Sequence, residues 1–368
     1  MSTKYMLVAL GHLIAVSVVL KVLQLILPCC ITCYYTCAAT SLMAVIVAKM
    51  TFGLTKKKLL AERIQPDNRA VLITGCDSGF GHNLAKQLDS KGFHVFASCL
   101  FSDGPGADDL RKSCSKRLQI LGLDVSKDES VKDALEFVKE NLGTSELWAI
   151  VNNAGIVKGY SVELSNMQSF KDTFEINTFG VVRVTKAFLP LLRQSRGRVV
   201  NLCSLAGRIP LSHCTAYTMS KFAAVAFTEC LRQEMSVWGV KVVSVEPECF
   251  ETGLTKPENI CNTIEATFAD IEEDIRSDYG DQYLKGLKEN FVNTVRICSS
   301  KMYKVLNALE DAISLEEPDY VYRPCRNIVF SAFFKLIELI PRPLNDFLRC
   351  NVYATITGFP TPKEASNS

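Results

Sequence analysis

Apolar and polar positions divide the chain into two parts. No charged residue occurs from Val22 to Ala48, and this run exceeds the roughly 20 residues that a helix needs to cross a bilayer. A second apolar stretch, from Tyr5 to Leu20, precedes it and ends at Lys21. The pattern predicts a membrane anchor over residues 1–48 with one transmembrane helix or two. A cleaved signal peptide fits poorly, because the joint apolar length is too great and no clear small-x-small site follows.

Basic residues follow this apolar part. Lys49, the cluster Lys56–Lys58 and Arg63 lie just after it. Cationic residues next to a membrane helix tend to stay on the cytoplasmic side, so we expect the rest of the chain to face the cytosol. Residues 49–68 are predicted to be a basic linker that ends at Pro66-Asp67-Asn68.

After the linker, short β-branched and apolar runs alternate with amphipathic stretches. The runs predict strands at 70–74, 94–98, 118–122, 147–151, 197–203 and 241–246, and the stretches predict helices at 83–91, 127–141, 169–192 and 217–237. Repeated β-α-β units predict an α/β fold with a central parallel sheet and helices on both faces.

Composition narrows the range of functions. The formal net charge of +2 produces no field that would attract nucleic acid, so no nucleic-acid partner is expected. The fifteen cysteines show no metal-ligand spacing, and the one C-x-x-C, Cys30–Cys33, lies inside the apolar run. We therefore predict free thiols in a reducing compartment and no metal. Cys29 and Cys30 are either palmitoylation sites or apolar packing residues.

Tyr217 and Lys221 carry the clearest chemistry. Their spacing places them on one face of the predicted helix, one turn apart. A free tyrosine hydroxyl is a poor acid or base at neutral pH, but a lysine ammonium close to it stabilises the phenolate. The pair is therefore a candidate for proton transfer. His213 is an alternative base, although a role in a loop or in lining the substrate site is the simpler interpretation.

A glycine-rich turn at Thr74–Gly81 follows the first predicted strand and opens a helix. Glycines there allow a tight turn and the close approach of a pyrophosphate, which the helix N-terminus then binds. Asp124 ends the third strand and is a candidate acceptor for an adenine amine, and Asn153-Ala154-Gly155 ends the fourth. The residues after the second strand, Cys99-Leu100-Phe101, include no acidic or basic side chain. Since Asp77 would repel a 2′-phosphate, we predict NAD rather than NADP.

Together these residues resemble the short-chain dehydrogenase/reductase superfamily over roughly residues 68–350. The matching motifs are the TGxxxGxG turn at Thr74–Gly81, NNAG at Asn152–Gly155, the family asparagine at Asn177, the serine at Ser204 and YxxxK at Tyr217–Lys221. The residues of the glycine-rich turn resemble those of one branch of this superfamily, which contains the retinol dehydrogenases, 17β-hydroxysteroid dehydrogenase type 2 and D-3-hydroxybutyrate dehydrogenase.

The resemblance implies a doubly wound Rossmann fold and a Ser-Tyr-Lys mechanism. Tyr217 would be the general base in alcohol oxidation, Lys221 would assist it and hold the nicotinamide ribose, and Ser204 would hydrogen-bond the reacting oxygen. Asn177 would link Lys221 to a water chain. The cofactor contacts implied are Thr74, Gly75, Asp77, Ser78, Gly79, Gly81, Asp124, Asn153, Ala154, Gly155, Tyr217, Lys221 and Pro247. A homodimer through the helices that carry Asn177 and Tyr217 is a further family expectation.

The substrate is expected to be a small lipophilic alcohol or ketone, of steroid or retinoid type. The dehydrogenase domain would span 69–350, with a substrate lid and an apolar C-terminal helix at 258–345, followed by a tail at 351–368. The apolar segment Ile328–Ile340 is too short and too charged to span a membrane. We predict a membrane location in the endoplasmic reticulum, or alternatively in mitochondria.

Two other functions remain open from the sequence. A D-3-hydroxybutyrate-type dehydrogenase would need a cation for its substrate carboxylate, and Arg208 is the candidate. A catalytically weak dinucleotide-binding scaffold is suggested by Glu248, which follows Pro247 where the family usually has glycine. A glutamate there would bring bulk and negative charge near the nicotinamide.

Overall fold

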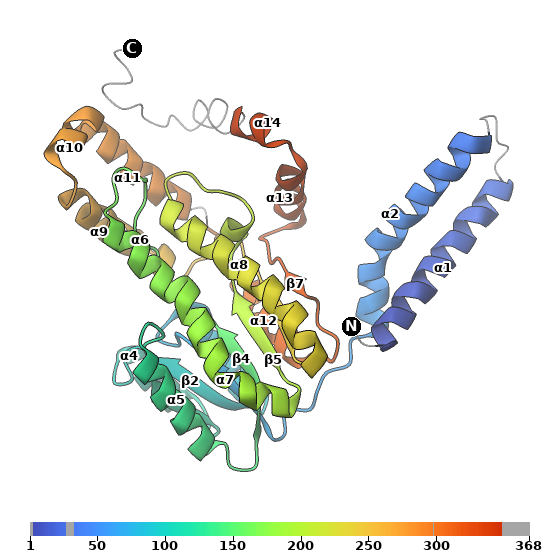
Figure 1. Ribbon diagram of the computed structural model, residues 1–368, viewed down its shortest axis with the longest axis horizontal. Helices are drawn as coiled ribbons and strands as arrows, with labels where there is room; N and C mark the ends of the chain where they lie inside the picture. Colours follow the sequence, from blue (N-terminus) through green and yellow to red (C-terminus); the bar gives the residue numbers. More distant parts are fainter. Residues whose placement is uncertain (1–2, 27–32, 297, 348–368) are drawn as a thin grey trace. The chain divides into compact units, whose positions relative to one another are not determined.

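A computed structural model describes residues 3–26, 33–296 and 298–347. The chain forms two compact units (Figure 1). The first contains the described residues of Met1–Gln65 and Ser314–Pro318, and the second contains those of Pro66–Ile313 and Asp319–Ser368.

The first unit is built on two helices, α1 (Thr3–Ile26) and α2 (Cys33–Leu59). His12 of α1 joins them, because its Nε2 lies 2.7 Å from Thr51 Oγ1 and its Nδ1 lies 2.7 Å from Thr55 Oγ1. Large apolar side chains such as Ile14 and Met43 are exposed. Polar groups of this hairpin therefore face each other while apolar groups face outward.

The apolar run and the basic residues do not divide at a helix end. The uncharged run Val22–Ala48 is shared between the end of α1 and the start of α2. The basic residues Lys49 and Lys56–Lys58 lie within α2, which continues to Leu59, because lysine is a good helix former. None of the described helices is both long enough and apolar enough to cross a membrane. The proposed palmitoylation sites, Cys29 and Cys30, lie outside the described residues.

The second unit has a parallel sheet of seven described strands in the order β3-β2-β1-β4-β5-β6-β7. The strands are β1 (Arg69–Ile73), β2 (His94–Cys99), β3 (Leu118–Gly122), β4 (Glu146–Asn152), β5 (Arg198–Leu202), β6 (Lys241–Val245) and β7 (Val321–Tyr322). The order reverses between β1 and β4, so the ends of these strands form the topological switch point at which ligands bind in such folds.

Helices connect the strands and cover the sheet. They are α3 (Gly79–Ser90), α4 (Pro105–Ser113), α5 (Asp128–Asn141), α6 (Met167–Phe174), α7 (Val181–Ser195), α8 (Thr215–Met235), α9 (Pro257–Ala269), α10 (Glu273–Tyr279), α11 (Asp281–Arg296), α12 (Tyr303–Ser314), α13 (Ile328–Leu339) and α14 (Arg342–Phe347). Short helical turns are η1 (Glu175–Gly180, a π-helix), η2 (Leu205–Gly207), η3 (Ser236–Trp238) and η4 (Gly253–Thr255).

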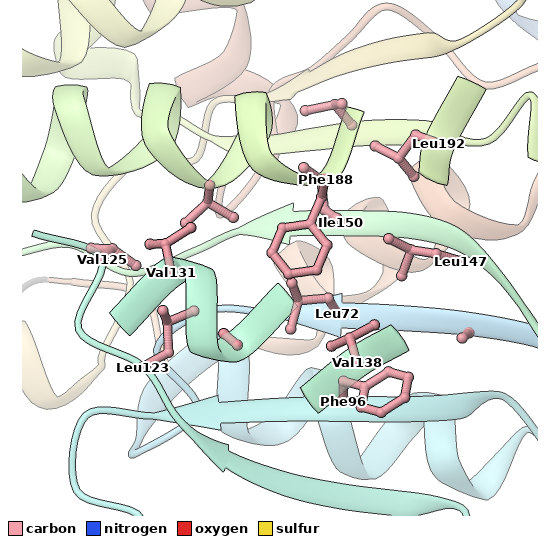
Figure 2. Packing of buried hydrophobic residues seen from close by; sticks show 14 of the residues in the cluster. Leu72, Phe96, Leu123, Val125, Val131, Val138, Leu147, Ile150, Phe188 and Leu192 are labelled. Carbon is pink, nitrogen blue, oxygen red and sulfur yellow. The ribbon is translucent and has the colours of Figure 1, made fainter. Parts of the chain in front are cut away.

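One face of the sheet carries the main apolar cluster. Phe188 and Leu192 of α7 pack onto Leu72 and Ile150 of the sheet, and Val138 of α5 joins them (Figure 2). All five side chains are fully removed from solvent. Burial of such side chains stabilises a fold by about 1.5–3 kcal/mol each, so this cluster fixes the sheet that positions the strand ends.

Helices α3 and α12 are joined to each other through Glu310 of α12. Its carboxylate accepts hydrogen bonds from Gln87 of α3 and, at 2.6 Å, from Lys91, which directly follows that helix. The α3 helix also packs against β2 and buries Leu84 and Leu88. The predicted doubly wound α/β fold with a central parallel sheet is confirmed.

Candidate active site

The glycine-rich turn after β1 is held in shape by its close packing. Gly75 and Gly79 have φ values of +71° and +66°, a region that favours glycine. A Cβ on Gly75 would lie 2.9 Å from Ala154 Cα, and one on Gly81 would lie 2.4 Å from Asn153 Nδ2. The turn therefore needs glycines both for its backbone and for contact with the end of β4.

Hydrogen bonds tie this turn to the end of β4. Asn153 Nδ2 donates to the carbonyl oxygens of Thr74 and Gly75 at 2.7 and 2.9 Å. Thr74 Oγ1 accepts from the backbone N–H groups of Asn153 and Ala154 at 2.9 and 3.0 Å. Thr74 and Asn153, both predicted cofactor residues, thus use their side chains to hold the backbone around the helix N-terminus at Ser78.

Asp77 supplies an acidic group at the end of β2. Its carboxylate accepts hydrogen bonds from the backbone N–H groups of Leu100 and Phe101 at 2.9 and 3.0 Å. In dinucleotide folds an acidic residue near this strand end binds the ribose hydroxyls. Neither Leu100 nor Phe101, the two residues directly after β2, is acidic, and the structure supplies an acid from the glycine-rich turn.

Asp124 lies after β3 and shapes its own turn. One carboxylate oxygen accepts from Ser126 N at 2.9 Å and from Ser126 Oγ at 2.6 Å. Its backbone N–H donates to Ser130 Oγ at 3.0 Å. The side chain stays beside the strand end, where the sequence predicted an adenine contact.

The Tyr-Lys pair lies at the start of α8. The Lys221 side chain is buried, and its Nζ lies 5.6 Å from the centre of the Tyr217 ring. Nζ also donates to the carbonyl oxygen of Leu202, the last residue of β5, at 3.0 Å. Ser204 follows the same strand, and its Oγ accepts from Ala206 N at 3.1 Å. The fold thus places an ammonium group beside the tyrosine and near the strand end that carries Ser204.

Asn177 connects the pair to the end of β4. Its Nδ2 donates to Ile156 O at 2.9 Å and to Ser220 Oγ at 3.0 Å, and its Oδ1 accepts from Ile156 N at 2.8 Å. A Cβ built on Gly155 would lie 3.2 Å from Asn177 Oδ1 and 3.8 Å from Lys221 Nζ. Gly155, Asn177 and Lys221 therefore surround one small space, and a larger residue at 155 would fill it.

Glu248, whose negative charge was expected to lie near the nicotinamide, pairs with Arg326. The sequence alone does not indicate this partner. The Glu248 side chain is 2% exposed, and Oε1 accepts from the Nε of Arg326 at 2.9 Å and from its backbone N–H. Pro247 accepts a hydrogen bond from Leu205 N at 3.0 Å through its carbonyl oxygen. The negative charge of Glu248 is therefore balanced within the protein.

Arg208 has partners within the protein too. It donates to buried Glu246 at 2.8 Å and to Glu229 at 2.6 Å, and these carboxylates raise its pKa although burial opposes them. Arg323 also binds Glu246, at 2.9 Å. The guanidinium expected to bind a substrate carboxylate is thus engaged by two carboxylates of the protein.

His213 lies in the loop between Ser204 and Tyr217. Its φ is +59°, and its Nδ1 is 2.8 Å from Ser161 Oγ. Burial lowers the pKa of its imidazole below the ordinary value. The side chain therefore joins two loops near the strand ends and favours the neutral form.

One expectation about the cysteines is wrong. Cys249 and Cys298 form a disulfide with Cα atoms 4.9 Å apart, while eight other described cysteines are free. No local pattern marks this pair, since a separation of 49 residues has no diagnostic meaning. The contact arises because the segment after β6 runs beside the segment after α11, where Phe250 and Ser299 form an isolated bridge.

The residues present fit a nicotinamide dinucleotide. The glycine turn and helix N-terminus leave backbone groups for a pyrophosphate. Asp77 is held at the end of β2, and Lys221 Nζ lies near both the Tyr217 ring and the small space beside Gly155. These features are those of a dinucleotide-binding α/β protein that carries a Tyr-Lys pair at the strand ends.

Comparison with known proteins assigns the family. Residues 69–261 match the family model "short chain dehydrogenase". The chain belongs to this family and is a nicotinamide-dependent oxidoreductase that acts on a CH–OH group.

Named relatives fall within the branch that the sequence motifs resembled. The chain is 44% identical over 262 residues to estradiol 17-beta-dehydrogenase 2 of Mus musculus, covering 71% of this chain and 69% of the relative. It is 40% identical over 276 residues to the mitochondrial D-beta-hydroxybutyrate dehydrogenase of Mus musculus, and the match covers 73% of this chain and 80% of that relative. A short chain dehydrogenase/reductase from Burkholderia phymatum, solved with NAD, shares the fold with a TM-score of 0.60 and 21% identity, covering 74% of this chain and 94% of that one.

Proposed function

We propose that this protein is a membrane-associated, NAD-dependent dehydrogenase of a lipophilic alcohol of steroid type. The observation that carries the proposal is the buried Lys221 ammonium beside the Tyr217 ring at the end of β5. This ammonium can stabilise the Tyr217 phenolate, which would be the base that removes the hydroxyl proton.

In oxidation, the Tyr217 phenolate takes the proton from the substrate hydroxyl. Lys221 stabilises that phenolate by its charge, and Ser204 donates a hydrogen bond to the substrate oxygen, which helps to hold it in place. Asn177 positions the loop at Ile156 and the helix at Ser220, so it keeps Lys221 beside the site. Bound NAD would supply the hydride acceptor.

Asp77 supports NAD over NADP. Its carboxylate is fixed by two backbone N–H groups at the end of β2. An acid there accepts hydrogen bonds from ribose hydroxyls and repels a 2′-phosphate. No arginine or lysine directly follows Cys99, the last residue of β2, to bind that phosphate.

A lipophilic substrate is supported by the helices between β6 and α12. Two buried apolar clusters pack them, one around Ile264 and Cys298 and one in which Leu287 joins Leu164 of the segment before α6. Arg208 is engaged by Glu246 and Glu229, which weakens the case for a carboxylate-bearing hydroxy acid. One relative is named for estradiol and one for hydroxybutyrate, so both substrate classes enter the test.

Membrane association is supported by the hairpin of α1 and α2. Its polar groups pair internally at His12, while Ile14, Val18, Met43 and Ile46 are exposed. An apolar surface of this kind favours lipid over water. The basic residues of α2 support a cytosol-facing catalytic domain, in the endoplasmic reticulum. Full-length protein should stay with membranes after alkaline carbonate extraction, and its release into the supernatant would exclude integral association.

The activity test is NAD reduction by membranes carrying the full-length protein. The panel is a 17β-hydroxysteroid, a second hydroxysteroid, retinol and D-3-hydroxybutyrate, with membranes carrying Tyr217→Phe as the blank. Turnover of one lipophilic alcohol supports the proposal. Turnover of hydroxybutyrate alone would replace it with the second candidate, and NAD binding with no turnover on a wider panel would favour a scaffold.

A further inference from the structure

The disulfide between Cys249 and Cys298 joins two functionally different segments. Cys249 lies two residues after Pro247, in the segment that follows β6. Cys298 lies just after α11 and packs in the apolar cluster around Ile264. The bridge therefore closes a loop that contains α9, α10 and α11, the three helices proposed to cover the substrate.

The two cysteines stay close without the sulfur bond. Ser299 N donates to Cys249 O at 3.0 Å, and Glu251 N donates to Ser299 O at 3.0 Å. Their Cα separation of 4.9 Å lies within the range that a disulfide requires. Since the backbone keeps the pair in register, the thiols of a reduced pair remain adjacent and can re-form the bond.

The lid helices are packed by the apolar clusters around Ile264 and Leu287, whereas their polar contacts with the segment before α6 are exposed. Tyr279 OH donates to Glu163 at 2.7 Å, and Asn166 Nδ2 donates to Asp270 at 3.1 Å, and both hydrogen bonds are solvent-exposed. Exposed hydrogen bonds open readily, so these contacts allow local opening. Among the described contacts of the lid helices, the Cys249–Cys298 disulfide is covalent, so it does not open with them.

We propose that Cys249 and Cys298 form a redox-sensitive modification site, where a small-molecule thiol or disulfide changes how freely the lid helices open. A cytosol-facing chain with eight free described cysteines and one disulfide fits this use, because disulfides in reducing compartments are usually transient or regulatory. The proposed site consists of Cys249 and Cys298 and uses none of Ser204, Tyr217 and Lys221.

The exchange is balanced by two equivalents of thiol. A thiolate attacks the sulfur of Cys249, which is the less buried of the two residues, and Cys298 leaves and takes up a proton. A second thiol then releases the Cys249 thiol, and the small molecules leave as their disulfide. Glutathione disulfide reverses the sequence by accepting the same two electrons.

Limited trypsin digestion of the full-length protein tests the proposal. Arg276 and Lys285 are exposed cleavage sites in the lid helices. After treatment with glutathione disulfide the lid should resist cleavage, and after dithiothreitol it should be cut about tenfold faster, because the cross-link limits chain opening. Cys249→Ser and Cys298→Ser should be cut at the fast rate in both conditions. Cys230→Ser, an exposed cysteine on α8, should behave like the wild type.

Peptide mapping must find Cys249 linked to Cys298 after oxidation. Free thiols at both positions, or equal cleavage rates for oxidised and reduced wild type, would overturn the proposal. Reduction alters the wild type without any substitution, so an unstable serine variant does not decide the result. That the segment covers a substrate rests on the proposed function, whereas the digestion readout does not, so the two fail separately.

Discussion

The carboxylate of Glu248 accepts two hydrogen bonds from Arg326, one from the backbone N–H and one from Nε. The guanidinium of Arg326 also lies over the ring of Phe330, 4.3 Å from its centre. The segment after β6 is thereby joined to the start of α13. A glutamate at the position where the family usually has glycine thus has a structural partner in this chain.

Glu248→Gly should lower stability without improving NAD binding. The change removes a charge-assisted pair that is almost fully buried on the Glu248 side, and such hydrogen bonds contribute about 1.5–3 kcal/mol. Thermal unfolding and NAD titration measure the two effects. Glu251→Gln, an exposed glutamate of the same segment, is the matched control. A large gain in NAD affinity for Glu248→Gly would instead mark Glu248 as the cause of a degraded site.

Tyr217→Phe should abolish nearly all turnover while NAD still binds. General acid-base catalysis contributes about 10²–10⁴-fold, and the phenyl ring keeps the packing against Lys221 while losing the proton-transferring group. Initial rates and fluorescence titration with NADH measure this. Tyr303→Phe, at an exposed tyrosine, should keep the wild-type rate. Normal turnover by Tyr217→Phe would move the base elsewhere.

Asp77→Asn should shift the cofactor preference toward NADP. The amide keeps the size of the carboxylate but removes the negative charge that opposes a 2′-phosphate. The ratio of kcat/KM for NADP to that for NAD should rise by about tenfold, which corresponds to ~1.4 kcal/mol. Asp103→Asn, whose side chain is 97% exposed after the same strand, should leave the ratio unchanged. No change in Asp77→Asn would remove the case for NAD.

His213→Gln should reduce the loss of stability in acid. Burial lowers the pKa of His213 from 6.5, so the unfolded state binds a proton at a higher pH than the folded state. The imidazole therefore contributes stability fully above pH 6.5, and this is lost as the pH falls through its folded pKa. Unfolding measured between about pH 7.5 and 5 should show a smaller decline for the variant. The same decline in both proteins would contradict the assignment.

The chemistry of the site could be read from local sequence, but the partners of its residues could not. Tyr217 and Lys221 were predictable because helical spacing alone brings them together, and the glycine turn because backbone geometry demands it. Asp77 was judged only by its charge, since its contact with the end of β2 depends on the sheet order. Arg326 and Cys298 are distant in sequence, and no local pattern indicates a partner at such separations.

The fold shows the same limit. The strands β1 to β6 can be predicted to within about two residues, because each is a short run of mostly apolar and β-branched residues. The two-residue β7 was missed, since its pairing with β6 rather than its own pattern defines it. The predicted helix 169–192 is divided into α6, η1 and α7, because a π-helical turn at Glu175–Gly180 leaves no periodic signal. The α4 helix was missed because it is short and polar.

The position of the lid helices in the chain has a consequence for evolution. They are inserted between β6 and the segment leading to β7, and their two ends meet where Phe250 bridges Ser299. An insertion whose ends lie side by side can change in length or sequence without shifting the strands on either side of it. The same hydride-transfer scaffold can thus acquire new substrates through replacement of the segment that contains α9, α10 and α11.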